Sequence, residues 1–409
     1  MMADLIKREL LNRIKKTKFF ISKNGWSNDY INKRVTRFEK ILSNYVPHWL
    51  DELYDMQKLT GIKKEDILTL NCLPSGSHKG ECTSFMCIEE NNNFLHKNRD
   101  ERDLVQHVYI KQFDRTYKYI AGTDIGNLGI AHFLNEKGVA GANNTGSVVL
   151  DREINEIGLS DCHIMRVIAE KASNCEDALE IVKEIVGRGF CGNAGKNRGM
   201  IFLIVDKDKG VIIENTSKHL SYKKINQGVE VRANHFLLKN MKKHETEKPN
   251  KNTITRYNRT KFLLKDVTGM APQSCWKISR DYHDGPDSIC NDDRKHFWMT
   301  ISAFTHIVNR RMPDMSLSWI CNGNTRNSFY FPLHIINKTV PDFIISGQFY
   351  QISKELYRKH GLSSYLGKRQ KKIEDENFNR IRGLSGSKLI REEQNIIFNL
   401  YKLMQRLYV

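Results

Sequence analysis

The sequence predicts an α+β fold in which helices cover two antiparallel sheets. Three observations support it: a helical pattern over about the first seventy residues, short strand-like runs from residue 82 onward, and a pair of amphipathic helices between blocks of strands. Because helices and strands come in separate blocks, the pattern favours segregated layers over alternating strand–helix units.

The first seventy residues have the periodicity of helices. Leu5, Ile6, Leu10 and Ile14 recur at a spacing of three to four residues, and later apolar residues continue at helical spacing. Gly61 ends one predicted helix, and a short helix follows it. The segment 74–77, Pro-Ser-Gly-Ser, is typical of an exposed loop. A helical leader therefore precedes the change of pattern.

Short strands dominate the middle of the chain. Turns rich in Asn and Gly separate them, which favours antiparallel pairing and a meander of the first six. Two helices, 161–172 and 175–186, interrupt the strands, and the polar segment 240–256 predicts a mobile loop before a helix at 257–268. The expected strands are 83–88, 94–97, 105–113, 117–122, 128–133, 139–142, 200–205, 211–214, 229–233, 298–304 and 316–321.

Composition places the chain among globular proteins. It has 409 residues, of which 40% are hydrophobic and 10% aromatic. No apolar run approaches the ~20 residues needed to cross a bilayer. Charges interrupt the apolar residues near the N-terminus, so we expect no signal peptide and a cytoplasmic location. Nine cysteines without a CxxC pair argue against disulfides and zinc, and the scattered histidines predict no metal site.

Positive charge is concentrated at the two ends of the chain. The formal net charge is +18, and the segments 1–50 and 351–409 supply most of it, whereas the middle is nearly balanced. Such ends would suit nucleic acid, an anionic membrane surface or an acidic partner. The simpler interpretation is that they are solvated helix faces. We predict a basic, helical C-terminal extension at 350–409.

The junction between the leader and the first strand contains the most informative residue. The sequence GECTSF at 80–85 ends the loop and opens the strand. Cys82 there suits a nucleophile that is liberated by cleavage of the chain. Its new α-amino group, with a pKa of ~7.7–8.0, would serve as general base. Composition and spacing alone would leave Cys82 an ordinary buried cysteine.

Several short motifs occur in a characteristic order along the chain. They are DILTLN at 66–71, CTSF at 82–85, KNRD at 97–100, GVAGANN at 138–144, ANHF at 233–236, RDYHDG at 280–285 and SIC at 288–290. In this order, over about residues 45–325, the chain resembles the acyl-coenzyme A:6-aminopenicillanic acid acyltransferase family of the N-terminal-nucleophile hydrolase superfamily. The resemblance implies a four-layer α/β/β/α sandwich, with a leader at 1–81 and a catalytic body at 82–349.

The resemblance also implies roles for the matching residues. Cys82 would be the nucleophile, exposed by cleavage of the Glu81–Cys82 bond. Asp100 would orient the nucleophile or its amine, and the Asn234 amide would donate to the oxyanion. The family usually has Gly where Glu81 stands, so cleavage is expected to be slow, and it commonly has Arg where Asn291 stands. The residues expected to bind substrate are Arg99, Asn143, Asn144 and His235.

The expected reaction is acyl transfer from a linear amide or thioester to water or an amine, through an acyl-enzyme on Cys82. No cofactor is expected, although the family resemblance allows an acyl-coenzyme A as co-substrate. The expected partners are a small-molecule amide or acyl donor, and the two self-cleaved fragments are expected to stay associated. Two alternatives remain open at this point. One is a plain amidase of the acid-ceramidase-like kind, and the other is an inactive relative that binds nucleic acid or another partner through its basic termini.

Overall fold

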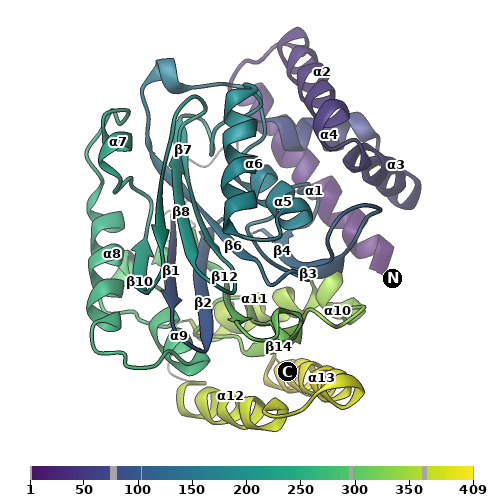
Figure 1. Ribbon diagram of the computed structural model, residues 1–409. Helices are drawn as coiled ribbons and strands as arrows, with labels where there is room; N and C mark the ends of the chain where they lie inside the picture. The colour runs from purple at the N-terminus through teal and green to yellow at the C-terminus, as the bar shows by residue number, and fades with distance from the viewer. Residues whose placement is uncertain (1, 74–80, 103, 294–297, 362–365, 409) are drawn as a thin grey trace.

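The computed structural model describes residues 2–73, 81–102, 104–293, 298–361 and 366–408. Two antiparallel sheets lie face to face in the middle of the molecule, and helices cover their outer faces (Figure 1). Residues from both sheets form the apolar interior, among them Phe85, Leu95, Ile120 and Leu203. The predicted four-layer α/β/β/α sandwich is therefore confirmed.

The first sheet carries the predicted nucleophile near its edge. Strand β1 pairs with β10 on one side and β2 on the other, and Cys82 lies opposite Arg99 of β2. The strand order is β10-β1-β2-β12-β13-β14, and β11 pairs with β12. Its strands are β1 (Glu81–Ile88), β2 (Asn92–Glu101), β10 (Gly228–Arg232), β11 (Asp292–Asp293), β12 (Trp298–Asn309), β13 (Leu317–Asn322) and β14 (Tyr330–His334).

The second sheet is a continuous meander. Its strands pair in sequence order from β3 to β9. They are β3 (Gln106–Lys111), β4 (Tyr119–Asp124), β5 (His132–Asn135), β6 (Ala140–Val148), β7 (Arg198–Val205), β8 (Gly210–Asn215) and β9 (Leu220–Ile225).

Helices form the two outer layers. Those that share an apolar core on the outside of the second sheet are α1 (Met2–Lys23), α2 (Asn28–Tyr45), α3 (His48–Thr60), α4 (Lys64–Cys72), α5 (Asp161–Lys171) and α6 (Cys175–Gly187). The remaining helices are α7 (Lys239–Lys242), α8 (Lys251–Leu264), α9 (Pro272–Ser279), α10 (Asp342–Ile345), α11 (Gln348–His360), α12 (Gly367–Ile381) and α13 (Gly386–Tyr408). Of these, α8, α9 and α11 to α13 contact the first sheet.

Local sequence signals set several helix ends. The Asn174 side chain accepts from the Asp177 N–H at the start of α6. Helix α3 stops at Gly61, which adopts φ +71°, a backbone conformation that other residues rarely take. These ends follow from residues only a few positions apart.

Two predictions of secondary structure were wrong. The first six strands do not form one meander, because the chain leaves the first sheet after β2 and starts the second with β3. Alternation of apolar residues shows that a segment is a strand but not which sheet it joins. The predicted loop 240–256 is also partly helical: Asn250 caps α8, which begins at Lys251. Its solvent-facing polar residues concealed a buried face.

The leader packs firmly on the body. Leu10, Phe38 and Trp49 share an apolar core with α5 and α6, and the purple helices of the leader lie beside α5 in Figure 1. Charged groups join the same two parts. Arg166 of α5 donates to Glu52 (2.6 Å), and Trp49 Nε1 donates to Glu170 (3.0 Å). The leader is thus part of the outer helical layer of the second sheet.

The predicted C-terminal extension packs against the first sheet. Its last helix, α13, buries Leu389, Ile396, Leu400 and Met404 in the same core as the strands. Glu374 of α12 accepts from Arg280 (2.6 Å). The yellow helices α12 and α13 therefore cover one end of the sandwich (Figure 1).

The structure bears on two further expectations. Within the described ranges, no helix is long and apolar enough to cross a membrane. All nine cysteines are free, so no disulfide links the described parts of the chain.

Candidate active site

Cys82 is held at the start of β1 by hydrogen bonds to its backbone. Its N–H donates to Asn234 Oδ1 (2.8 Å), and its carbonyl oxygen accepts from Arg256 Nη1 (2.6 Å). In the uncut chain this nitrogen is the amide of the Glu81–Cys82 bond, within strand β1. The Asn234 oxygen therefore lies at the atom that cleavage would convert into an α-amine.

Cys82 lines a cavity, and the residue is only 7% exposed. Burial raises the pKa of the Cys82 thiol, and the buried ammonium of Lys97 acts in the opposite direction. The nearby Asp100 carboxylate adds to the rise in this pKa. A thiol with a raised pKa is mostly protonated near neutral pH, so it requires a base to become a nucleophile.

Asp100 lies on β2, directly across the strand pair from Glu81 and beside Thr300 of β12. Its Oδ1 accepts from Thr300 Oγ1 (2.6 Å), and the carboxylate is almost fully buried. Its backbone, unlike its carboxylate, acts to lower the pKa of the Cys82 thiol. The structure thus brings Asp100, Cys82 and the Glu81–Cys82 bond together.

Asn234 follows β10 and contacts three parts of the site. Its Oδ1 accepts from the Cys82 N–H and from Arg256 Nη2, each at 2.8 Å. Its Nδ2 donates to the carbonyl of Thr145 on β6 (2.8 Å). The oxygen of the amide therefore faces the nucleophile's nitrogen, and one of the two amide hydrogens is bound to β6.

Arg256 is a site residue that the sequence analysis missed. It lies on α8 and is completely buried, and its guanidinium donates to Cys82 O (2.6 Å), Thr83 Oγ1 (2.9 Å) and Asn234 Oδ1 (2.8 Å). It fell inside the predicted polar loop, among many other basic residues. The signal that was available is the helical spacing of Thr253, Arg256 and Thr260, which form the buried polar face of α8.

A cavity of about 320 Å³ lies beside Cys82. Both the body and the leader line it. The leader contributes Arg13, Lys16 and Phe20 of α1, and the loop 193–195 closes another part of the wall. A cavity of this volume is at the lower end of the range for small-molecule sites.

Two predicted substrate-binding residues lie in the cavity wall. Arg99 forms a two-pronged ion pair with Asp124 (2.6 and 2.9 Å). Asn143 Oδ1 accepts from Lys97 Nζ (2.8 Å), and its Nδ2 donates to Asp161 (2.8 Å). In the same wall, burial raises the pKa of the Glu101 carboxyl to about 7, although Arg99 opposes the rise. The wall thus combines charges of both signs.

The other two predicted substrate-binding residues do not line this cavity. Asn144 accepts from Ser84 Oγ (2.7 Å) and donates to the carbonyls of Arg232 and Ala233, so it ties β6 to β1 and to the end of β10. His235 Nδ1 contacts Thr253 Oγ1 (2.9 Å), and burial lowers the pKa of its ring to about 4. Both residues support the strand ends around Asn234.

Comparisons with known proteins identify one matching family model. The model of acyl-coenzyme A:6-aminopenicillanic acid acyl-transferase matches residues 87–326, which is more than half of the chain and begins five positions after Cys82. A search of the curated proteins finds no match.

Solved structures with a similar arrangement include two hydrolases. A variant of conjugated bile acid hydrolase from Clostridium perfringens shares 13% identity at a TM-score of 0.41, over 62% of this chain and 92% of that one. A Caenorhabditis elegans ortholog of N-acylethanolamine-hydrolyzing acid amidase shares 12% identity at a TM-score of 0.38, over 57% of this chain and 94% of that one.

Proposed function

Since this chain belongs to the acyl-coenzyme A:6-aminopenicillanic acid acyl-transferase family, within the N-terminal-nucleophile amidohydrolases and acyltransferases, we propose that it is a self-processing cysteine enzyme of that kind. Cys82 is the nucleophile, and the substrate is a linear amide or a thioester. The observation that carries this proposal is the contact of the Cys82 backbone nitrogen with Asn234 Oδ1 beside a buried cavity.

Maturation uses the residues around the Glu81–Cys82 bond. The Cys82 sulfur attacks the Glu81 carbonyl carbon, the C–N bond breaks, and the Cys82 nitrogen leaves as an amine that takes up the thiol proton. Water then hydrolyses the thioester at Glu81 and frees both the carboxylate and the thiol. Asp100 lies across the strand pair from Glu81 and orients this step.

Turnover follows with the freed α-amine as the base. The amine takes the proton of the Cys82 thiol, the thiolate attacks the substrate carbonyl carbon, and the leaving group takes the proton when its bond breaks. Asn234 has one amide hydrogen bound to Thr145 O, and we assign its second hydrogen to the developing oxyanion. Water or an amine then removes the acyl group from Cys82.

The cavity indicates the class of substrate. Its volume of about 320 Å³ suits a small acyl group. The wall has apolar side chains such as Phe20 and Leu104 beside charged ones such as Lys16 and Arg102. We infer a small-molecule amide or acyl donor that has both an apolar and a polar part. An acyl-coenzyme A remains a proposed co-substrate, and the reaction needs no other cofactor.

The experiment compares Cys82→Ala with Cys87→Ala, two cysteines on the same strand. The unaltered protein is expected to split into fragments 1–81 and 82–409, roughly 9 and 38 kDa by their shares of the 47.6-kDa chain. Sequencing of the larger fragment should start Cys-Thr-Ser-Phe. Cys82→Ala should stay intact and inactive, whereas Cys87→Ala should still be cleaved, because Cys87 does not line the cavity.

Two results would contradict the proposal. One is an unaltered, folded protein that remains a single chain after long incubation. The other is a Cys82→Ala variant that still cleaves itself. Alkylation with iodoacetamide adds an independent readout, since Cys82 should react faster than the other cysteines in the processed protein.

A further inference from the structure

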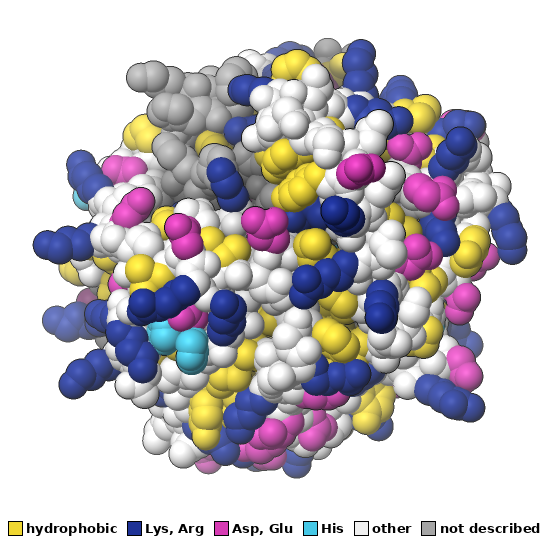
Figure 2. All heavy atoms as spheres, turned by 90° about the horizontal axis from the view of Figure 1, so that it is seen from above, with side chains coloured by type: hydrophobic (Ala, Val, Ile, Leu, Met, Phe, Trp, Pro, Cys, Tyr) yellow, Lys and Arg dark blue, Asp and Glu magenta, His cyan; other side chains and the backbone are white. Residues whose placement is uncertain are grey.

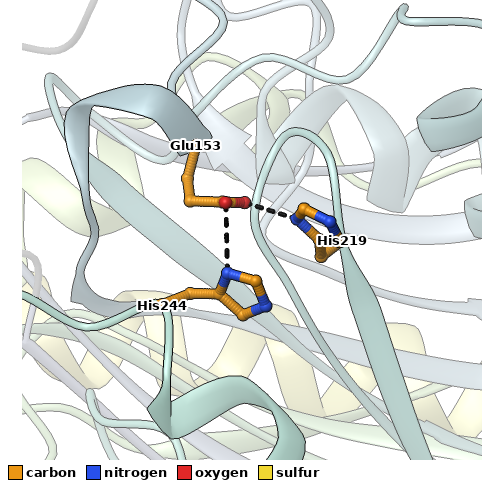
Figure 3. Close-up of side chains that lie close together, drawn as sticks. All are labelled: Glu153, His219 and His244. Carbon is orange, nitrogen blue, oxygen red and sulfur yellow. Dashed lines mark hydrogen bonds and ion pairs between the residues drawn. The ribbon is translucent and has the colours of Figure 1, made fainter.

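A cluster of two histidines and one glutamate lies away from the cavity, in three different connections (Figure 3). Glu153 ends the short 3₁₀ helix Asp151–Glu153 after β6. His219 lies in the turn between β8 and β9, and His244 follows α7. None of the three lines the cavity beside Cys82.

The three side chains converge on one point. His219 Nδ1 is 2.7 Å from Glu153 Oε2, and His244 Nδ1 is 3.1 Å from Oε1. The two imidazole rings are stacked, with centroids 4.5 Å apart. In Figure 3 both rings direct a nitrogen toward the carboxylate.

Hydrogen bonding does not fully account for this arrangement. His244 Nδ1 is buried and makes no well-formed hydrogen bond within the described residues, although it lies close to the Glu153 carboxylate. Glu153 Oε2, by contrast, accepts from both Thr216 Oγ1 (2.7 Å) and His219. A buried polar atom without an aligned partner is costly, and a bound cation between the three groups would satisfy it.

We propose that Glu153, His219 and His244 bind a divalent transition metal ion, with Zn²⁺ the best match to two imidazoles and one carboxylate. Ligand atoms ~2.0–2.2 Å from zinc lie about 3.3 Å apart in a tetrahedral site. The observed separations are 2.7 Å to one carboxylate oxygen and 3.1 Å to the other, and one ligand atom from each residue lies within 4.8 Å of the others, so small movements of the side chains would bring the set to this spacing. The His219 side chain is 53% exposed, so its ring can adjust, and a water can take the fourth position.

Charge around the cluster permits a cation. Arg152 competes for the same carboxylate, since its Nε lies 3.9 Å from Glu153 Oε1. That side chain is 74% exposed and can turn into solvent when a metal binds. The ligands are then one anionic carboxylate and two neutral imidazoles, which is the state that zinc requires.

A metal here would fasten three connections to each other and to the strands next to the active site. Leu150 N donates to His244 O (3.0 Å), which ties the His244 turn to the end of β6. Ser147 on β6 accepts from the N–H of Phe236, two residues after Asn234 (2.9 Å). We therefore assign the metal a structural role outside the reaction itself.

The test uses full-length protein without an affinity tag, treated with chelator and titrated with Co²⁺ and then Zn²⁺. The unaltered protein should take up one Co²⁺ with visible ligand-field absorption, lose that absorption when Zn²⁺ displaces it, and gain thermal stability with either ion. His219→Ala should weaken binding about tenfold or more. This variant should fold, because His219 is half exposed.

His283→Ala is the matched control, since it removes an exposed histidine elsewhere and should bind the metal like the unaltered protein. Glu153→Gln should weaken binding as His219→Ala does. Two outcomes overturn the proposal: an unaltered protein that shows neither absorption nor a change in Tm, or a His219→Ala variant that binds as tightly as the unaltered protein.

Discussion

Arg256 places a buried positive charge directly against the nucleophile. Its four hydrogen-bond partners are Cys82 O, Thr83 Oγ1, Asn234 Oδ1 and Asn252 Oδ1, all of them neutral acceptors. No carboxylate among the described residues pairs with this guanidinium, and burying an unpaired guanidinium costs free energy, so we infer that the position serves function more than stability. The charge is positioned to stabilise negative charge that develops near Cys82.

We predict that Arg256→Lys slows both self-cleavage and turnover by at least about tenfold, a loss of ~1.4 kcal/mol in transition-state stabilisation. A lysine can replace the charge but not the planar set of donors that contacts Cys82 and Asn234 together. Single-turnover cleavage rates and kcat/KM would measure the effect.

Arg259→Lys is the control on the same helix. Arg259 pairs with Asp281 (2.8 Å) and has no contact with Cys82, so its replacement should leave the cleavage rate unchanged. Equal rates for Arg256→Lys and the unaltered protein would remove Arg256 from the mechanism.

Asn234 is tested by a nearly isosteric change. We predict that Asn234→Asp folds but keeps less than about a tenth of the activity, a loss above ~1.4 kcal/mol. A carboxylate repels the developing oxyanion, and it cannot donate to Thr145 O as the amide does. Circular dichroism would check the fold and kcat/KM the loss. A variant that keeps more activity would contradict the oxyanion assignment.

Among the secondary-structure elements, α3 and α5 form a buried polar link between leader and body. Glu52 of α3 accepts from Arg166 of α5 and from Lys111 of β3. Burial opposes ionisation of Glu52, but Arg166 and Lys111 outweigh it and lower the pKa of this carboxyl to about 2.

The lowered pKa of Glu52 predicts an acid-dependent loss of stability. Its usual pKa is 4.5 and its pKa in the folded protein is about 2. The contribution of ionised Glu52 to the free energy of unfolding is therefore complete above pH 4.5 and disappears as the pH falls toward 2. Glu52→Gln should lower the free energy of unfolding at pH 7 by on the order of 3 kcal/mol. In this variant the free energy of unfolding should also change less between pH 4.5 and pH 2.

Urea unfolding from pH 2 to 7 would measure this effect. Glu39→Gln is the control, because Glu39 pairs with Lys64 inside the leader and does not reach the body. If Glu52→Gln and Glu39→Gln had identical pH profiles, the proposed link between α3 and α5 would not be important for stability.

At the scale of the whole molecule, the leader completes both the core and the cavity. Its helices share apolar side chains with α5 and α6, and α1 forms part of the wall beside Cys82. Positive charge is concentrated at the two ends of the sequence, but it is less clearly separated from negative charge on the surface of the folded protein. On the face shown in Figure 2, Lys and Arg side chains lie among Asp and Glu side chains and form no single basic field. An anionic partner for the termini and a cytoplasmic location stay predictions.

We predict that the two fragments remain associated after cleavage. Separating them would expose the apolar faces around Leu10, Phe38 and Trp49, at a cost of roughly 25 cal/mol for each Å² of apolar surface. Fragments 1–81 and 82–409 should co-elute in size-exclusion chromatography and separate only in denaturant. Elution of the larger, active fragment by itself would contradict this and would show that α1 is not needed in the cavity wall.

The sequence by itself determined most of the local structure and the class of fold. Periodicity and helix caps depend on residues a few positions apart, so α5, α6 and the β7–β8 hairpin could be predicted. Short motifs in order indicated the family and pointed to Cys82, Asp100 and Asn234, which the fold brings together.

Only the tertiary structure decided which distant residues meet. Arg256 reaches Cys82 across 174 positions of sequence, and Glu153, His219 and His244 come from three unrelated connections, so no local spacing shows which residues these side chains meet. The same holds for the division of the early strands between two sheets and for Asn144, which binds strand ends instead of the cavity. Such contacts depend on how whole layers pack. The hydrophobic effect depends on the apolar area that is buried and not on how far apart the residues are in the sequence, so a local pattern cannot identify the partner.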